Sequence, residues 1–135
     1  MFRNGGYTVA ARNPGTILLV DDDESVRRLV RDILREQRYH LIEAGDGAEA
    51  LEVASVHAGP IDLLLTDVIM PKLDGVRLAE QMLQHRPGIA VLFMSGYVEG
   101  ALLCAGRPNV ALLQKPFRAD HLIDGVREAL GSAGG

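Results

Sequence analysis

Polar side chains follow four short apolar runs of this chain, at the point where each run ends. The four groups are the acids Asp21-Asp22-Asp23 after residues 16–20, Asp67 after residues 61–66, Ser95 after residues 89–94, and Lys115 after residues 110–114. Carboxylates bind divalent metal ions, while a hydroxyl and an ammonium bind phosphoryl oxygens. Open sheets of parallel strands bind ligands at the carboxyl ends of the strands. If the apolar runs are such strands, the four groups converge on one site.

Asp21, Asp22 and Asp67 offer the ligands that Mg²⁺ prefers, since this ion binds hard oxygens and takes one or two carboxylates besides water and phosphate oxygens. An acidic run before a helix has another explanation, because acids cap helix N-termini and interact favourably with the helix dipole. That explanation is preferred for Asp23 and Glu24, which fall inside the predicted helix.

Lys115 lies between a buried strand and Pro116. A lysine there offsets the repulsion among clustered carboxylates and pairs with a phosphoryl oxygen as a point charge, although most lysines are solvated surface residues. Ser95 by itself is an ordinary turn residue. Beside an acidic metal site its hydroxyl is a donor for a phosphoryl oxygen, and Gly96 leaves room for that group.

Short apolar runs alternate with amphipathic stretches, and this alternation positions the polar groups. Strands are predicted at about 16–20, 40–44, 61–66, 89–94 and 110–114, and helices at about 24–37, 46–56 with Asp46 as the cap, 76–83, 98–105 and 119–130. Several strands are continuously apolar, which indicates burial on both faces and hence a parallel sheet. Repeated strand–helix units of this length predict an α/β domain with a doubly wound five-stranded parallel sheet.

Length and composition set further bounds. The 135 residues suit one domain, expected at 15–131 between a flexible N-terminal tail or linker (1–14) and a flexible C-terminus (132–135). A net charge of −4 argues against nucleic acid as a partner. The single cysteine, Cys104, excludes an internal disulfide. No apolar run approaches the roughly 18 residues of a membrane span, so we expect no membrane partner and a cytoplasmic location.

Five segments of the chain, taken in order, resemble the receiver domain of two-component response regulators. They are Ile17-Leu18-Leu19-Val20-Asp21-Asp22-Asp23-Glu24, Leu65-Thr66-Asp67-Val68-Ile69-Met70-Pro71, Asp74-Gly75, Met94-Ser95-Gly96-Tyr97 and Gln114-Lys115-Pro116-Phe117. The resemblance spans about residues 15–130. It implies a flavodoxin-like (βα)₅ fold with strand order 2-1-3-4-5, and a signalling module rather than an enzyme with an external substrate.

The resemblance also implies a role for each site residue. The implied set is Asp67 as the phosphoacceptor, Asp22 and Asp67 as Mg²⁺ ligands, Asp21 as a ligand through water, the backbone carbonyl of Ile69 as a further ligand, Ser95 as the hydroxyl donor and Lys115 as the counter-ion. The implied partners are a histidine kinase or a histidine phosphotransfer protein, whose phosphohistidine donates the phosphoryl group, and an unidentified output partner. Mg²⁺ is the implied cofactor, with Mn²⁺ as a substitute, and the acyl phosphate is expected to hydrolyse slowly.

The chain departs from the family pattern at Leu112, where many receivers have the Tyr or Phe of their switch. Tyr97 either substitutes for it or is an exposed loop residue. The span from Ser95 to Lys115 is short, which predicts a truncated or irregular fourth helix. The sequence around Ser95 and Lys115 resembles that of receivers attached to hybrid kinases. The chain is therefore either a stand-alone receiver or a receiver cut from a longer kinase, and both interpretations remain open.

Other functions fit less well. Gly45-Asp46-Gly47-Ala48-Glu49-Ala50 matches a dinucleotide-binding pattern, but it lies in the second strand–helix unit, and the first such turn is acidic. A P-loop is absent from the sequence, and a hydrolase with an aspartyl nucleophile would have a second acid where Ile69 stands. A receiver-like interaction module that is never phosphorylated remains the alternative, although Asp22, Asp67, Ser95 and Lys115 are all intact.

Overall fold

The computed structural model describes residues 14–96 and 110–134, and strands and helices alternate along the described chain. The elements in chain order are β2 (Thr16–Val20), α1 (Glu24–Glu36), β3 (His40–Ala44), α2 (Gly47–Val56), β4 (Leu63–Asp67), α3 (Gly75–His85), β5 (Ala90–Ser95), β6 (Val110–Gln114) and α5 (Ala119–Gly134). Residues 1–13 of the tail predicted at 1–14, the helix predicted near 98–105, Tyr97 and Cys104 lie outside the described residues.

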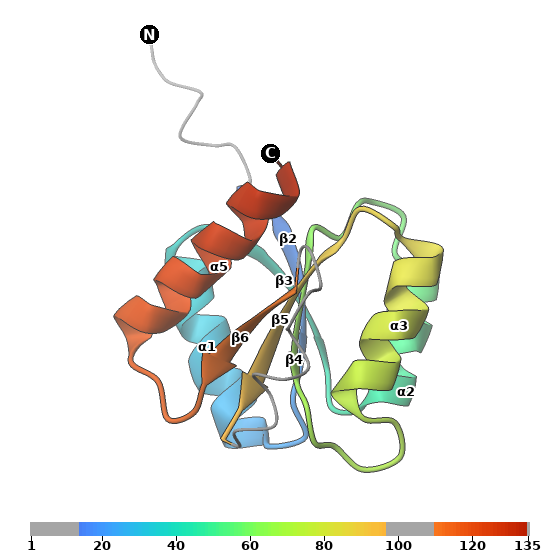
Figure 1. Ribbon diagram of the computed structural model, residues 1–135, viewed down its shortest axis with the longest axis horizontal. Coiled ribbons are helices and arrows are strands. Elements are labelled where there is room, and N and C mark those ends of the chain that lie inside the picture. Colours follow the sequence, from blue (N-terminus) through green and yellow to red (C-terminus); the bar gives the residue numbers. More distant parts are fainter. Residues whose placement is uncertain (1–13, 97–109, 135) are drawn as a thin grey trace, which may run out of the picture.

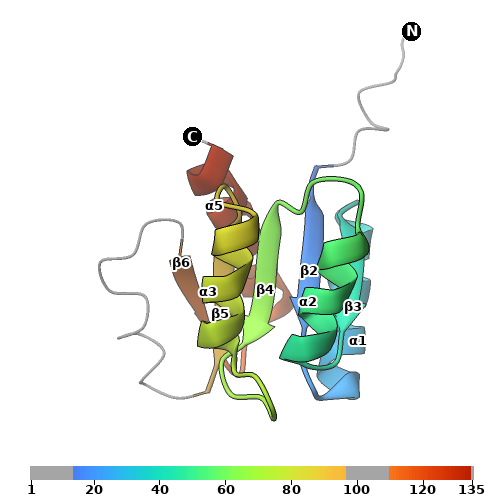
Figure 2. The same ribbon diagram turned by 90° about the vertical axis from the view of Figure 1, so that its right-hand side faces the viewer.

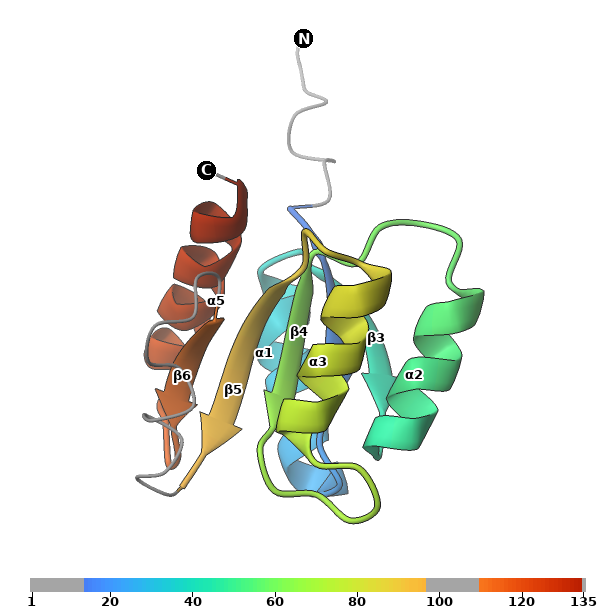
Figure 3. The ribbon, with the colours of Figure 1, turned by 45° about the vertical axis from the view of Figure 1, so that its right-hand side comes forward.

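The strands form one parallel five-stranded sheet in the order β3-β2-β4-β5-β6. This is the order 2-1-3-4-5 expected for a flavodoxin-like fold, so the predicted fold class is confirmed. Helices α1 and α5 cover one face of the sheet and α2 and α3 cover the other (Figures 1 and 3). Among the described residues, no helix is long and apolar enough to cross a membrane.

The sheet is buried on both faces, which explains its continuously apolar strands. Ile17 and Leu19 of β2 belong to the core beneath α1 and α5, whereas Leu18 and Val20 belong to the core beneath α2 and α3. All four side chains are fully buried. Because successive strand residues point to opposite faces, each central strand contributes to both cores, and each buried leucine or isoleucine contributes roughly 2 kcal/mol.

Side-chain carboxylates fix where three helices begin. Asp23 accepts hydrogen bonds from the amides of Ser25 and Val26 at the start of α1, Asp46 accepts from the amide of Glu49 at the start of α2, and Asp74 accepts from the amide of Arg77 at the start of α3. Each therefore satisfies amide donors that have no partner within the helix. The predicted cap at Asp46 and the capping role preferred for Asp23 are confirmed.

Several element boundaries differ from the sequence expectation. Strand β4 begins at Leu63 rather than at Ile61, and Asp67 and Ser95 are the last residues of β4 and β5 instead of following them. Helix α5 continues to Gly134, where the sequence predicts an end near Leu130 and a flexible C-terminus over 132–135. An established helix gains one hydrogen bond per added residue without a new nucleation step, so it continues past its last apolar position.

Candidate functional site

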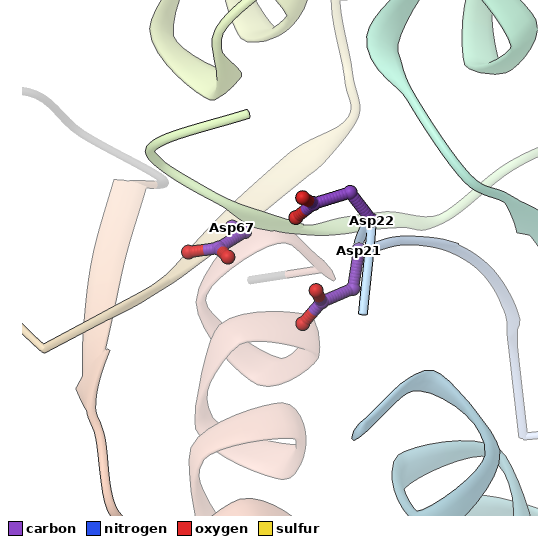
Figure 4. Close-up of side chains that lie close together, drawn as sticks. All are labelled: Asp21, Asp22 and Asp67. Atoms are coloured by element: carbon purple, nitrogen blue, oxygen red, sulfur yellow. The ribbon is translucent and has the colours of Figure 1, made fainter. Parts of the chain in front are cut away.

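Three carboxylates gather at the carboxyl ends of β2 and β4. Asp21 and Asp22 directly follow β2, and Asp67 ends β4. One oxygen of each carboxylate lies within 4.8 Å of the others, and Figure 4 shows the three side chains extending toward a common space. From β2 the chain goes first to β3 on one side and later to β4 on the other. The cluster therefore lies at the switch point of the sheet, where open α/β folds bind ligands.

The ammonium of Lys115 completes this cluster from the end of β6. Its Nζ lies 3.3 Å from Oδ2 of Asp21 and 3.3 Å from Oδ2 of Asp67. The Asp21 side chain is 0% exposed, while those of Asp67 and Lys115 are 17% and 26% exposed. One cation thus faces two carboxylates in a partly desolvated site. The convergence of residues 21, 22, 67 and 115, expected from the strand ends, is present in the structure.

Burial and charge shift the pKa of both Asp67 and Lys115. Burial raises the pKa of the Asp67 carboxyl, and neighbouring Asp21 raises it further, against the lowering effect of Lys115. For Lys115, burial by itself lowers the pKa, but attraction to Asp21 and Asp67 outweighs it, so the pKa lies above its ordinary value. Lys115 therefore stays charged at neutral pH, and the Asp67 anion is held at some electrostatic cost.

Ser95 lies near the cluster on the neighbouring strand, and Ile69 lies near it in the sequence. Ser95 is the last residue of β5, is 2% exposed, and its carbonyl accepts the amide of Lys115 at 2.7 Å. Met94 pairs with Asp67 across the sheet, so Ser95 is the residue just beyond the phosphoacceptor candidate on the neighbouring strand. Ile69 lies two residues after Asp67, and its side chain is 60% exposed. The Lys115–Pro116 peptide bond is cis.

The backbone of Asp67 is held by its neighbours in sequence and in space. The hydroxyl of Thr66 lies 3.0 Å from the Asp67 carbonyl oxygen, and the amide of Val68 donates to the carbonyl of Met94 at 3.2 Å. Gly75, the first residue of α3, packs directly on the Asp67 carbonyl. These contacts fix the stretch of backbone from which the Asp67 carboxylate extends.

Sequence reasoning missed Arg27, which contacts the acidic turn. Its Nη1 donates to the carbonyl oxygen of Asp21 at 2.6 Å, and its Nε lies 3.5 Å from a carboxylate oxygen of Glu43. One signal was available in the sequence. A cation at the fourth position of a helix opposes the helix dipole, so an arginine there suggests a partner outside the helix.

Leu112 occupies the position where many receivers have an aromatic residue. It lies on β6 and packs, partly buried, against the core beneath α2 and α3. Its strand is at the edge of the sheet, next to β5. At the position where the sequence departs from the family pattern, the structure therefore has a packed aliphatic side chain. The residue suggested as its substitute, Tyr97, is among those that the structure leaves undescribed.

The donor set of the cluster fits Mg²⁺. Three aspartate carboxylates supply hard oxygens and no nitrogen or sulfur, which is the ligand type of Mg²⁺ and Mn²⁺. Within the described residues, the carboxylate of Asp22 has no hydrogen-bond or ion-pair partner. An anion of this kind beside two other carboxylates is stabilised by a divalent cation.

Comparisons with known proteins agree with this geometry. Residues 17–127 match the response regulator receiver domain family. The receiver protein CpdR of Brucella abortus is 34% identical over 116 residues, which cover 84% of this chain and 95% of CpdR. The sensor kinase CckA of the same organism is 35% identical over 117 residues, which cover 85% of this chain and 12% of CckA. The chain thus spans about one eighth of the length of that kinase.

Solved structures show the same likeness. The crystal structure of the receiver domain from the hybrid histidine kinase CckA matches with a TM-score of 0.75 at 38% identity, covering 86% of this chain and 99% of that one. A response regulator receiver protein from Sinorhizobium medicae matches with a TM-score of 0.78 at 26% identity, covering 88% and 96%. Since the family match covers most of the chain and the acidic cluster lies at the ends of β2 and β4, this chain belongs to the response regulator receiver domain family.

Proposed function

We propose that this receiver domain accepts a phosphoryl group on Asp67 from a phosphohistidine of a histidine kinase or a histidine phosphotransfer protein. The observation that carries the proposal is the position of Lys115, whose ammonium lies 3.3 Å from the carboxylate of Asp67 beside the acidic cluster. A phosphoryl group brings negative charge into a site of three carboxylates. Positioning and charge neutralisation are the main requirements of phosphoryl transfer, and these residues supply both.

In the proposed reaction an oxygen of the Asp67 carboxylate forms a bond to phosphorus as the bond from phosphorus to the donor imidazole nitrogen breaks. The electron pair of that bond stays on the imidazole, which leaves as a neutral base after taking up a proton. Asp67 needs no base, because the ordinary pKa of an aspartate carboxyl lies well below neutral pH and the neighbouring Lys115 ammonium favours the anion, lowering the pKa against the effect of burial. Lys115 shifts its pairing to a phosphoryl oxygen, and the hydroxyl of Ser95 donates to another.

Asp22 and Asp67 would hold the divalent ion directly, Asp21 through water, and the Ile69 backbone carbonyl would be a further ligand. Mg²⁺, or Mn²⁺ in its place, supplies charge neutralisation for the phosphoryl oxygens. The Ile69 carbonyl accepts no hydrogen bond from any residue that the structure describes, which supports its assignment as a ligand.

The proposed partners are a phosphohistidine donor and an output protein of unidentified type, and the proposed location is the cytoplasm, where such donors act. The proposal covers two arrangements, a receiver that acts alone and a receiver within a longer kinase. Both are supported, because CpdR is matched over 95% of its length and the sensor kinase CckA over 12%.

The decisive experiment incubates the protein with Mg²⁺ and acetyl phosphate and measures its intact mass. We expect an adduct of one phosphoryl group that requires Mg²⁺ and is absent in Asp67→Asn. Asp32→Asn is the matched control, because this exposed aspartate lies on α1 and its carboxylate pairs with Arg31. The proposal is wrong if no adduct forms, or if Asp67→Asn is modified as efficiently as the Asp32→Asn control.

The alternative is an interaction module that works without phosphorylation. Two results would distinguish this alternative. Wild type and Asp67→Asn would bind the kinase or phosphotransfer partner equally well, and the wild-type protein would take up no phosphoryl group. The intact cluster of Asp21, Asp22, Asp67 and Lys115 favours the phosphoacceptor, since four charged groups in a partly buried site are costly to retain without a function.

A further inference from the structure

The guanidinium of Arg27 bridges the acidic turn and the neighbouring strand β3. Nη1 donates to the Asp21 carbonyl oxygen at 2.6 Å, and Nε lies 3.5 Å from Oε1 of Glu43. The two side chains are 20% and 26% exposed, so the contacts are partly shielded from water. Glu43 is itself anchored, because its second oxygen lies 3.5 Å from Nη1 of Arg31.

The Asp21 carbonyl belongs to the peptide unit that joins Asp21 to Asp22. A hydrogen bond to this oxygen fixes the orientation of that peptide plane and therefore the direction in which the Asp22 side chain leaves the backbone. Two further hydrogen bonds hold the residues on either side of Asp22: the Asp21 amide donates to the carbonyl of Ala44 at 3.3 Å, and the Asp23 amide donates to Oδ1 of Asp21 at 2.9 Å. Arg27 provides the contact that acts on the link to Asp22.

Asp22 depends on its backbone for its position. It is exposed, and within the described residues its carboxylate has no partner, although one of its oxygens lies within 4.8 Å of oxygens of Asp21 and Asp67. We propose that Arg27 is a positioning residue for divalent-metal binding, because by fixing the peptide between Asp21 and Asp22 it holds the Asp22 carboxylate against Asp67. This inference rests on the proposed function for the identity of the ion.

An arginine is required for this role because its two contacts leave the guanidinium in different directions. The planar group presents fixed donors to a carbonyl on one side and a carboxylate on the other, whereas a lysine has a single ammonium on a flexible stem. The contact between Arg27 and the Asp21 carbonyl also indicates that Arg27 acts by positioning the turn and not through its charge. Arg27 touches a neutral carbonyl oxygen of the turn, and its charge is balanced by Glu43.

The test measures the dissociation constant for Mg²⁺ by isothermal titration calorimetry, with no phosphodonor present, for wild type, Arg27→Met and Arg28→Met. Arg28 is the matched control, because it is the next residue of α1, loses the same charge, is 63% exposed and pairs with Glu24 of its own helix. We expect Mg²⁺ binding about tenfold weaker in Arg27→Met, the usual effect of losing a group that orients a metal ligand. Arg28→Met should bind Mg²⁺ as wild type does.

Arg27→Lys separates geometry from charge, and it also serves if the methionine variant fails to fold. A lysine keeps the charge but cannot make both contacts, so Mg²⁺ binding should again be weaker than in wild type. Glu43→Gln, which removes the anion that orients Arg27, should weaken binding in the same direction. Unchanged Mg²⁺ affinity in folded Arg27→Met, or in Arg27→Lys and Glu43→Gln together, overturns the inference, as does an equal loss in Arg28→Met.

Phosphorylation by acetyl phosphate gives a second readout. Arg27→Met should need about ten times more Mg²⁺ for half-maximal modification and should reach the wild-type extent when Mg²⁺ is saturating. A chain that binds Mg²⁺ in an Arg27-dependent manner but takes up no phosphoryl group contradicts the proposed function and supports the inference. If wild type is phosphorylated on Asp67 but Arg27→Met binds Mg²⁺ with wild-type affinity, the proposed function is supported and the inference about Arg27 is contradicted.

Discussion

Gly75 lies against the backbone carbonyl of Asp67, so close that a side-chain carbon at position 75 would overlap with the carbonyl oxygen. The amide of Gly75 also donates to the carbonyl of Val68 at 2.8 Å. The first residue of α3 therefore supports the end of β4, and the loop that joins β4 to α3 reaches the foot of Figure 2. Only a residue without a side chain allows helix and strand to approach this closely.

Gly75→Ala should therefore both destabilise the fold and disturb the site. The added methyl group forces Asp67 or α3 to move, and overpacking of this kind costs about 1 to 3 kcal/mol. Urea denaturation should show that loss of unfolding free energy, and Mg²⁺ titration should show weaker binding. Gly88→Ala is the control, since a methyl group there meets no atom within 4 Å. If both substitutions change stability and Mg²⁺ binding equally, the close contact between Gly75 and the Asp67 carbonyl is contradicted.

Asp67→Asn should make the protein more stable at neutral pH while abolishing phosphorylation. The pKa of Asp67 is raised in the folded protein, mainly by burial, so folding favours its protonated form. Its contribution to stability is complete below the pKa of the unfolded chain and is lost as pH rises through the folded pKa. The variant should gain roughly 1 kcal/mol at pH 7, the usual size of a single-residue effect. Denaturation measured at several pH values should show this gain shrinking on acidification.

Lys115→Met should bind Mg²⁺ more tightly and yet accept phosphoryl groups poorly. Removing the ammonium that lies 3.3 Å from Asp21 and from Asp67 leaves more negative charge for the ion, worth about 1 kcal/mol or fivefold in affinity. The same change removes a cation that pairs with the phosphoryl group. Calorimetry and intact mass measure the two effects. Lys72→Met, which removes a 72% exposed lysine, should change neither Mg²⁺ affinity nor phosphorylation. Weaker Mg²⁺ binding in Lys115→Met would refute the idea that the ammonium and the metal ion compete for the same carboxylates.

The acyl phosphate on Asp67 should persist for minutes or longer. Ile69, two residues beyond Asp67, has an exposed apolar side chain, and such a side chain offers no hydrogen bond to orient an attacking water. Donor removal followed by timed mass measurements gives the lifetime, and Ile69→Asn should shorten it. A wild-type half-life of seconds would be inconsistent with this role of Ile69.

Sequence patterns predicted most of the strands because each buried strand leaves a continuous apolar run. The bounds of β2, β3 and β6 match the expected ones. The start of β4 does not: the amide of Thr16 is bonded to the carboxylate of Asp62 at 2.8 Å, while the backbone of Asp62 bonds to Thr16 and Ala90. A side chain that replaces a backbone partner leaves no hydrophobic signal, so the boundary depends on the neighbouring strand.

The sequence by itself determined the fold class and the convergence of the acids with Lys115, because buried parallel strands are continuously apolar and their carboxyl ends share one edge. The order of the strands followed from the resemblance to receiver domains. Only the tertiary structure decided which further groups hold the acids in place. Arg27 reaches the Asp21 carbonyl, and Gly75 meets the Asp67 carbonyl. Both contacts involve backbone atoms, which every residue carries. Side-chain type can suggest that Arg27 has a partner outside its helix, but it does not identify which backbone atom that partner is until helix and strand are packed together.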